Sequence, residues 1–276
     1  DSIRFTLTAP ASGGASPGTV VRELDVQGYP VGSAPPAAGV SITRPVPRQV
    51  IQRGAGNVAT IAVNGTFSGS APDTIEARLL VMAGAGNTGS NTAWTVVAAA
   101  PAAGVFSGGI PGVRAGGWYQ LQVRPVTGGT PGPTNTVDRV GVGDIYVTCG
   151  QSNSANFGAP AGTVVDDRVS AWNFSGGVWT KAADPMPGAG GTGGSPWTRL
   201  GDLLAARDQV PVAFACLGVG SSSAASWTPP SGGNYARLTA AMQAFPSNGF
   251  RAVLWHQGET DSINSTASAD YQALLT

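Results

Sequence analysis

The stretch GDIYVTCGQSNS, residues 143–154, runs from an apolar segment of β character into a glycine, a glutamine and two serines around an asparagine. Two similar apolar runs follow, VPVAFACLGV at 210–219 and FRAVLWH at 250–256, and helix-like segments separate the three runs. Short apolar runs of this kind are typical of strands that are buried on both faces of a parallel sheet. Because such strands alternate here with helices, we predict an α/β domain over residues 141–276.

The helix-like segments carry recognisable start and stop signals. In SPWTRLGDLLAARD, Ser195 is a candidate N-cap and Pro196 a candidate first helical residue. In NYARLTAAMQAFP, Asn234 is a candidate N-cap and Pro246 a stop signal. The last segment, SADYQALLT at 268–276, also begins like a helix.

Residues 49–140 show a different pattern, in which short alternating segments are separated by turn residues. In GWYQLQVRPV, for example, Tyr119, Leu121 and Val123 alternate with polar side chains. Period-two segments with regular turn signals predict an antiparallel, Ig-like β-sandwich. Residues 1–48 are rich in proline and are predicted to form an N-terminal β or linker segment.

The composition argues against several partners. Charged residues make up 11% of the chain, with fifteen basic and fifteen acidic side chains, against about 25% in an average domain. We therefore expect no nucleic-acid partner. No apolar run approaches the roughly 20 residues of a membrane span, so we expect no membrane insertion. Cys149 and Cys216 end apolar runs and are interpreted as buried small hydrophobes.

The segments that follow the three apolar runs carry the candidate chemistry. Loops at the carboxyl ends of parallel strands converge on one crevice. Ser152 follows the first run, Gly220 and Ser221 follow the second, and Gln257 follows the third. A serine nucleophile with backbone N–H groups and a side-chain amide nearby is what acyl transfer requires, because negative charge develops on the carbonyl oxygen. No set of Cys, His or carboxylate residues has metal-ligand spacing, and we expect no cofactor.

GDIYVTCGQSNSANFG, the Gly-Ser-rich turn GSSSAASW and WHQGETD together resemble the sialate O-acetylesterase branch of the SGNH hydrolases, a group of carbohydrate esterases. The resemblance covers about residues 140–276 and implies a three-layer α/β/α domain with a parallel sheet. It also implies that Ser152 is the nucleophile of a GQSN block, with Gln151 and Asn153 in support. Gly220, Ser221 and Ser222 then match the oxyanion turn, where Ser221 replaces the family's second glycine.

The same resemblance implies a QGE block at residues 257–259, with Gln257 as an oxyanion donor. We interpret Glu259 as a residue that orients the GQSN loop through a hydrogen bond. The family places its base on an Asp-x-x-His block that does not occur here, and we expect the catalytic histidine beyond Thr276. His256, the one histidine of the sequence, is a weaker alternative, because in an extended segment it points away from Gln257.

These features predict a serine carbohydrate O-acetylesterase that removes acetyl groups from sialic acid or another acetylated glycan, with Trp227 as the tryptophan nearest to substrate. The alternative is a catalytically incomplete glycan-binding or structural component, such as part of a virion tail or a surface-attachment protein that assembles into a larger complex. The first residues, DSIRFTLTAP, have no signal-peptide pattern. We expect an extracellular, periplasmic or virion-associated protein whose signal was removed or that is exported by another route.

Overall fold

The computed structural model describes residues 39–276, apart from 85, 230–231 and 246–248. Residues from Pro36 to the end form one compact unit. Most of the predicted segment 1–48 therefore lies outside the described residues. The described strands are β1 (Gly39–Arg44), β2 (Val50–Gln52), β3 (Val58–Ser68), β4 (Thr74–Val81), β5 (Thr95–Ala99), β6 (Val105–Arg114), β7 (Trp118–Thr127), β8 (Thr130–Pro131), β9 (Asn135–Gly150), β10 (Val169–Asn173), β11 (Val178–Lys181), β12 (Val212–Cys216) and β13 (Ala252–His256).

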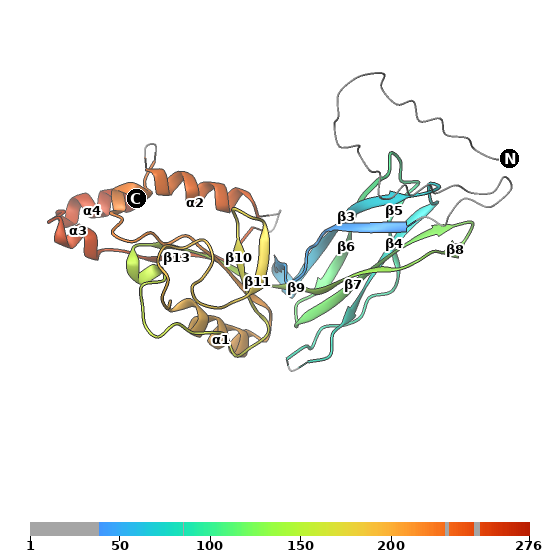
Figure 1. The fold of residues 1–276 in the computed structure, drawn as a ribbon, viewed down its shortest axis with the longest axis horizontal. Coiled ribbons are helices and arrows are strands. Elements are labelled where there is room, and N and C mark those ends of the chain that lie inside the picture. The colour runs from blue at the N-terminus through green and yellow to red at the C-terminus, as the bar shows by residue number, and fades with distance from the viewer. Residues whose placement is uncertain (1–38, 85, 230–231, 246–248) are drawn as a thin grey trace, which may run out of the picture. The chain divides into compact units, whose positions relative to one another are not determined.

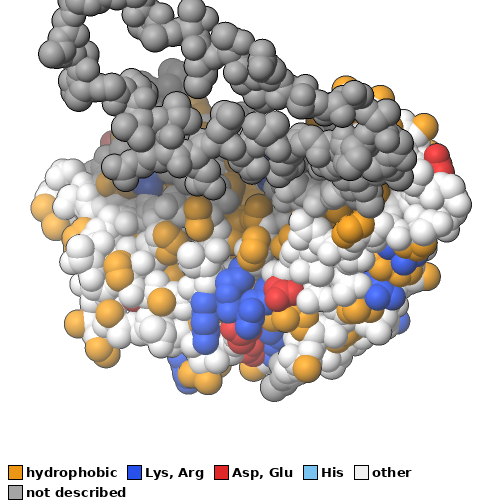
Figure 2. Space-filling model, turned by 45° about the vertical axis from the view of Figure 1, so that its right-hand side comes forward, with side chains coloured by type: hydrophobic (Ala, Val, Ile, Leu, Met, Phe, Trp, Pro, Cys, Tyr) orange, Lys and Arg blue, Asp and Glu red, His pale blue; other side chains and the backbone are white. Residues whose placement is uncertain are grey.

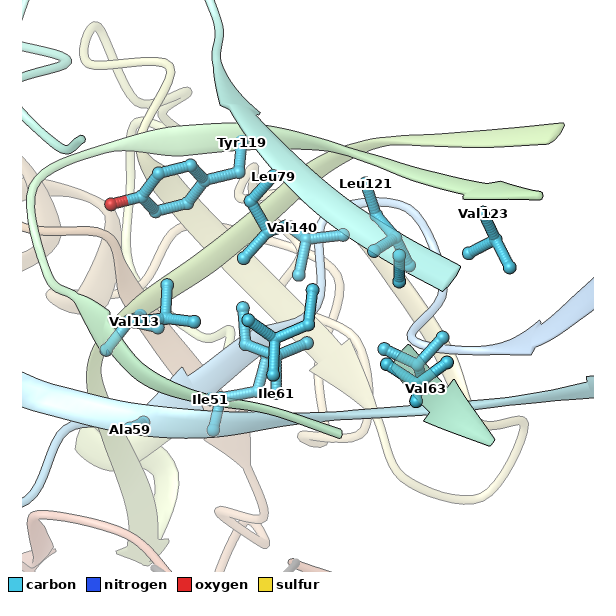
Figure 3. Close-up of a cluster of buried hydrophobic side chains, with 14 of the residues drawn as sticks. Ile51, Ala59, Ile61, Val63, Leu79, Val113, Tyr119, Leu121, Val123 and Val140 are labelled. Carbon is cyan, nitrogen blue, oxygen red and sulfur yellow. The ribbon is translucent and has the colours of Figure 1, made fainter. Parts of the chain in front are cut away.

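The first part of the described chain is antiparallel β-structure. A three-stranded sheet has the order β1-β3-β6, and β7, β4 and β5 are neighbours at one end of a second, ten-stranded sheet. Side chains from both sheets form one apolar cluster, in which Ile61 and Val63 of β3 pack with Leu79 of β4 and Leu121 of β7 (Figure 3). Strand β1 lies at the edge of its sheet and ends before Pro45, where proline begins to interrupt the chain.

The predicted period of two is confirmed in β7. Tyr119, Leu121 and Val123 are fully buried, whereas the side chains between them are half-buried. Trp118 departs from the pattern, because it is 2% exposed and packs in a second apolar cluster.

Strand β9 joins the two kinds of structure (Figure 1). Its first residues pair antiparallel with β7, whereas residues 144–148 pair in parallel with β12 on one side and residues 146–150 with β13 on the other. Strand β10 pairs in parallel with β12, and β11 pairs antiparallel with β10. The sheet is therefore mixed, and the predicted boundary between residues 140 and 141 falls inside β9.

The described helices are few. They are α1 (Trp197–Asp208), α2 (Gly233–Gln243), α3 (Glu259–Ile263) and α4 (Ser268–Leu275), with the short 3-10 helices η1 (Ala55–Asn57), η2 (Ser152–Ser154) and η3 (Ala224–Trp227). Tyr146 and Phe214 of the sheet pack with α1, whereas Val147 and Ala215, the next residue in each strand, pack on the side of α2. Because successive strand residues face opposite ways, α1 and α2 cover opposite faces of the sheet (Figure 1).

The predicted helix starts are shifted by one or two residues. Pro196, rather than Ser195, occupies the cap position of α1, although the Ser195 hydroxyl still accepts a hydrogen bond from the Trp197 N–H at 3.3 Å. Gly232 caps α2, and Asn234 lies inside the helix, where its side chain donates to the Ser226 hydroxyl instead of capping. Pro246 lies outside the described residues. The helix expected at the end of the sequence is confirmed as α4.

Charged side chains are sparse on the surface, and Figure 2 shows most of those on one face gathered in a group of both signs. Cys149 and Cys216 are buried free thiols, as predicted, and burial raises the pKa of each to about 12. No helix within the described ranges is long and apolar enough to cross a membrane.

Candidate active site

Hydrogen bonds join the carboxyl ends of three neighbouring strands. The Val219 N–H, after β12, donates to the carbonyl of Gly150 at the end of β9, at 2.9 Å. The Gln151 N–H donates to the carbonyl of His256 at the end of β13, at 3.1 Å. The three loops that the sequence singled out therefore meet at one edge of the sheet, as the parallel pairing requires.

Ser152 begins η2 directly after β9 and is half-buried. The chain can turn there because Gly150 has a φ of +124°, and a Cβ at that position would lie 2.0 Å from the carbonyl oxygen of His256. The Ser152 hydroxyl has no hydrogen-bond partner among the residues that the structure describes. It lines a pocket of about 340 Å³ together with His256 and the loops around Pro160 and Ser195.

Backbone N–H groups near this serine are without acceptors. Within the described part of the chain, the N–H groups of Ser152, Gly220 and Ser221 donate to no protein atom. Ser221 has a φ of +55°, so the residue that replaces glycine in the resembling motif occupies the left-handed region. Ser221 therefore adopts the backbone conformation of the turn under strain. The N–H groups of this turn remain available to bind a ligand oxygen.

Gln151 connects the loops from inside. Its side chain is 4% exposed, and its Oε1 accepts from the Thr260 N–H at 2.8 Å and from the Gly258 N–H and the Gln257 amide, each at 3.3 Å. Three donors on one amide oxygen hold the segment after β13 against the segment after β9.

The side-chain amide of Gln257 is occupied inside the protein. Its Nε2 donates to the carboxylate of Asp261, to the carbonyl of Ser222 at 3.1 Å and to Gln151. Its Oε1 is buried and has no donor among the described residues. The role of Gln257 as an oxyanion donor stays a prediction, and in this structure the free backbone N–H groups are the donors that remain available.

Asp261 has no assigned role in the motifs but holds the site together. It is 4% exposed and accepts from the Ala224 N–H at 2.8 Å, from Gln257 and from the Thr266 hydroxyl at 3.0 Å. Burial acts to raise the pKa of Asp261, but these hydrogen bonds outweigh it and hold the pKa below its ordinary value. Its position in the first turn of α3, four residues after Gln257, is the one sequence feature close to this contact.

Glu259 contacts the nucleophile loop as the sequence interpretation requires, because it accepts a hydrogen bond from the side-chain amide of Asn153. A hydrogen bond from its own backbone N–H, the Asn153 amide and the nearby His256 hold the pKa of Glu259 below its ordinary value. His256 Nε2 lies 3.8 Å from Glu259 Oε1. His256 is also a lining residue of the pocket of Ser152, and its role as the weaker alternative for the base stays a prediction.

Trp227 does not lie in the pocket. Its side chain is 5% exposed, its ring packs edge-on against Trp255, and its Nε1 donates to the Ser222 hydroxyl at 2.9 Å. The structure therefore corrects its predicted contact with substrate to a role in holding the turn from the core side. The aromatic side chain that sequence reasoning missed is Phe157, which is 56% exposed and packs against Gly220, where a Cβ would lie 2.8 Å from its ring.

Comparisons with known proteins give one matching family and several similar solved structures. Residues 142–276 match the family described as carbohydrate esterase, sialic acid-specific acetylesterase, which confirms the resemblance drawn from the motifs. A solved carbohydrate acetylesterase from Xanthomonas citri is 22% identical over 85% of this chain and 55% of its own, with a TM-score of 0.49. A protein from Arabidopsis thaliana is 18% identical over 48% of this chain and 65% of its own, with a TM-score of 0.39. The chain thus spans 55% and 65% of the lengths of these structures. No curated protein matches the chain.

Proposed function

Because residues 142–276 match the family of sialic acid-specific acetylesterases, we propose that this chain carries a serine O-acetylesterase that removes acetyl groups from sialic acid or another acetylated glycan. The observation that carries the proposal is the position of Ser152. It follows a buried strand, its hydroxyl is unpaired among the described residues, and it opens on a pocket beside free backbone N–H groups. In the same proposal, residues 141–276 form the SGNH-type α/β/α domain, and the strands before them form the Ig-like sandwich.

The reaction follows from these groups. The Ser152 oxygen attacks the acetyl carbonyl and loses its proton to a base, and the carbonyl oxygen gains negative charge. The N–H groups of Ser152, Gly220 and Ser221 then stabilise that charge, since one such donor contributes about 3 to 4 kcal/mol to the transition state. The bond to the sugar oxygen breaks, the sugar leaves with a proton, and acetyl-Ser152 remains. Water attacks this ester, releases acetate and restores the hydroxyl.

Asn153, Glu259 and Gln151 support the reaction without touching the reacting atoms. The hydrogen bond between Asn153 and Glu259 fixes one side of the nucleophile loop, and Gln151 fixes the other from inside. A nucleophile must be held within tenths of an ångström of its attacking position, so these contacts act on the rate.

The proposal extends to the surroundings of the enzyme. Its partner is an acetylated glycan, and its place is extracellular, periplasmic or virion-associated, with assembly into a larger complex in the last case. Sparse surface charge of both signs supports a neutral or weakly charged partner over a polyanion (Figure 2).

Acetate release from O-acetylated N-acetylneuraminic acid tests the function. We expect turnover by the complete protein and a loss of at least about 1,000-fold on Ser152→Ala, as removal of a serine nucleophile causes. Ser175→Ala on the exposed turn between β10 and β11 removes the same hydroxyl away from the site and is the matched control. Equal turnover by Ser152→Ala and Ser175→Ala would contradict the assignment.

A further inference from the structure

A second pocket lies apart from Ser152 and is lined by aromatic side chains. It holds about 210 Å³ between β1, the strands β10 and β11 and the end of α2, and we call it the aromatic pocket. Trp172 and Trp179 face each other across β10 and β11 with stacked rings 5.5 Å apart. Phe245 packs on Trp172 at 4.7 Å, and Phe174 completes the apolar wall. It shares no lining residue with the pocket of Ser152.

Three hydrogen-bond donors in this pocket have no acceptor among the residues that the structure describes. Gln49 is 7% exposed, and its Oε1 accepts from the Val46 N–H at 3.0 Å, but its Nε2 donates to none of the described residues. Trp172, also 7% exposed, has no acceptor for its indole N–H within the described ranges. Neither nitrogen is among the polar atoms sealed from solvent, and both residues line the aromatic pocket. Each nitrogen is therefore a hydrogen-bond donor that a ligand in the aromatic pocket can use.

The third donor adds a charge. Arg44 is exposed at the pocket rim and forms no hydrogen bond or ion pair with the described residues. The lining contains no Asp or Glu to neutralise it. An isolated guanidinium beside two neutral donors selects a ligand with several acceptor oxygens, at least one of them anionic.

The shape and the wall select the rest of the ligand. Aromatic side chains pack against the apolar C–H face of a sugar ring, and the hydroxyl groups of that sugar then project from the edge of the ring. The pocket is smaller than the roughly 300 to 1,000 Å³ of sites for drug-sized ligands, so it accommodates one ring. A pyranose with a carboxylate combines an apolar face, hydroxyl acceptors and an anion in one residue.

We propose that the aromatic pocket binds one acidic pyranose residue, with its carboxylate on Arg44, its hydroxyl oxygens on Gln49 and Trp172, and its apolar face against Trp179. This site goes beyond the proposed esterase and does not depend on Ser152. It gives the protein a second glycan-binding site, separate from the site of ester hydrolysis.

Saturation-transfer NMR on the full chain tests the site with four free sugars as probes. Glucuronic acid and N-acetylneuraminic acid carry the carboxylate, whereas glucose and galactose do not. We expect signals from the acidic sugars and at least tenfold weaker binding of the neutral ones. Arg44→Gln, at an exposed position, and Trp179→Ala should each weaken the acidic sugars at least tenfold. Val178→Ala, which changes the exposed neighbour of Trp179 on β11, is the matched control and should bind like the parent.

The outcomes separate this site from the esterase. Turnover of p-nitrophenyl acetate should stay within twofold in all three variants, because none of these residues lines the pocket of Ser152. Acidic-sugar binding that survives both Arg44→Gln and Trp179→Ala would place the ligand elsewhere and overturn the proposal. Absence of any acidic-sugar signal, or equal binding of glucose and galactose, would overturn it as well.

Discussion

Replacement of Asp261 by alanine tests whether one buried carboxylate holds the loops of the site together. The change leaves the Ala224 N–H and the Thr266 hydroxyl without the acceptor that a 4% exposed carboxylate gives them, whereas the Gln257 amide keeps Ser222 and Gln151 as acceptors. Each unsatisfied buried donor costs about 1 to 3 kcal/mol. We therefore expect the free energy of unfolding to fall by about 4 kcal/mol. Asp261→Asn keeps one acceptor oxygen, so its free energy of unfolding should fall by only about 2 kcal/mol, which is the contribution of the negative charge to these hydrogen bonds.

The dependence on pH gives a sharper form of the same prediction. The folded-state pKa of Asp261 lies below its ordinary value of 3.8. The carboxylate therefore contributes its full stability above pH of about 4, and this contribution is lost as the pH falls through the folded-state pKa. The difference in unfolding free energy between the parent and Asp261→Asn should be constant from pH 5 to 7 and should shrink in acid.

Urea unfolding followed by circular dichroism measures both effects. Asp270→Asn makes the same chemical change on the exposed first turn of α4 and should cost about 0.5 kcal/mol, the part due to the helix dipole. An Asp261→Ala variant within 1 kcal/mol of the parent would refute the reasoning. A difference in unfolding free energy between the parent and Asp261→Asn that does not shrink in acid would also refute the reasoning.

Three further predictions concern the same region. Ser221→Gly should stabilise the protein by about 1 kcal/mol in thermal unfolding, because glycine adopts the φ of +55° at this position without strain. Acetyl-ester turnover should stay within threefold, because the backbone N–H is unchanged. A loss of stability would contradict this prediction. His256→Ala should lower turnover by no more than about tenfold, since the imidazole forms no hydrogen bond with Ser152 within the described chain, whereas a loss of about 10⁴ would identify it as the base. Cys149 and Cys216 have pKa values of about 12, so both thiols should resist iodoacetamide at pH 8 in the folded protein and react with it in urea. Peptide mass spectrometry measures the labelling. Labelling of the folded protein would contradict the burial of these thiols.

The parallel strands were predictable because each of them is a short apolar run that can be read from the sequence alone. Apolar runs such as residues 145–149 fit only a strand that is covered on both faces, and the covering helices follow in the chain. Strand β6 was not predicted, because Gly108, Gly109 and Pro111 weaken the strand signal. Gly108 is needed for packing, since a Cβ there would lie 1.8 Å from the carbonyl oxygen of Val97, and this contact is visible only in three dimensions.

The candidate site was predictable as a set of loops but not as a set of contacts. Convergence of the loops follows from parallel pairing, which is a general property of such sheets. The direction of the Gln257 amide depends on Asp261, and the burial of Trp227 depends on Trp255, so neither follows from its own motif. The aromatic pocket joins Arg44 to Trp172, and no local pattern links segments so distant in the chain.

Covalent labelling of the full chain with a fluorophosphonate, which reacts with activated serine hydroxyls, tests the central claim most directly. Peptide mass spectrometry then identifies the modified residue. A phosphonylated Ser152, with competition by an acetylated sugar, is the predicted result. Modification of another serine, or none at Ser152 while the protein hydrolyses acetyl esters, would contradict the assignment of Ser152 as the nucleophile.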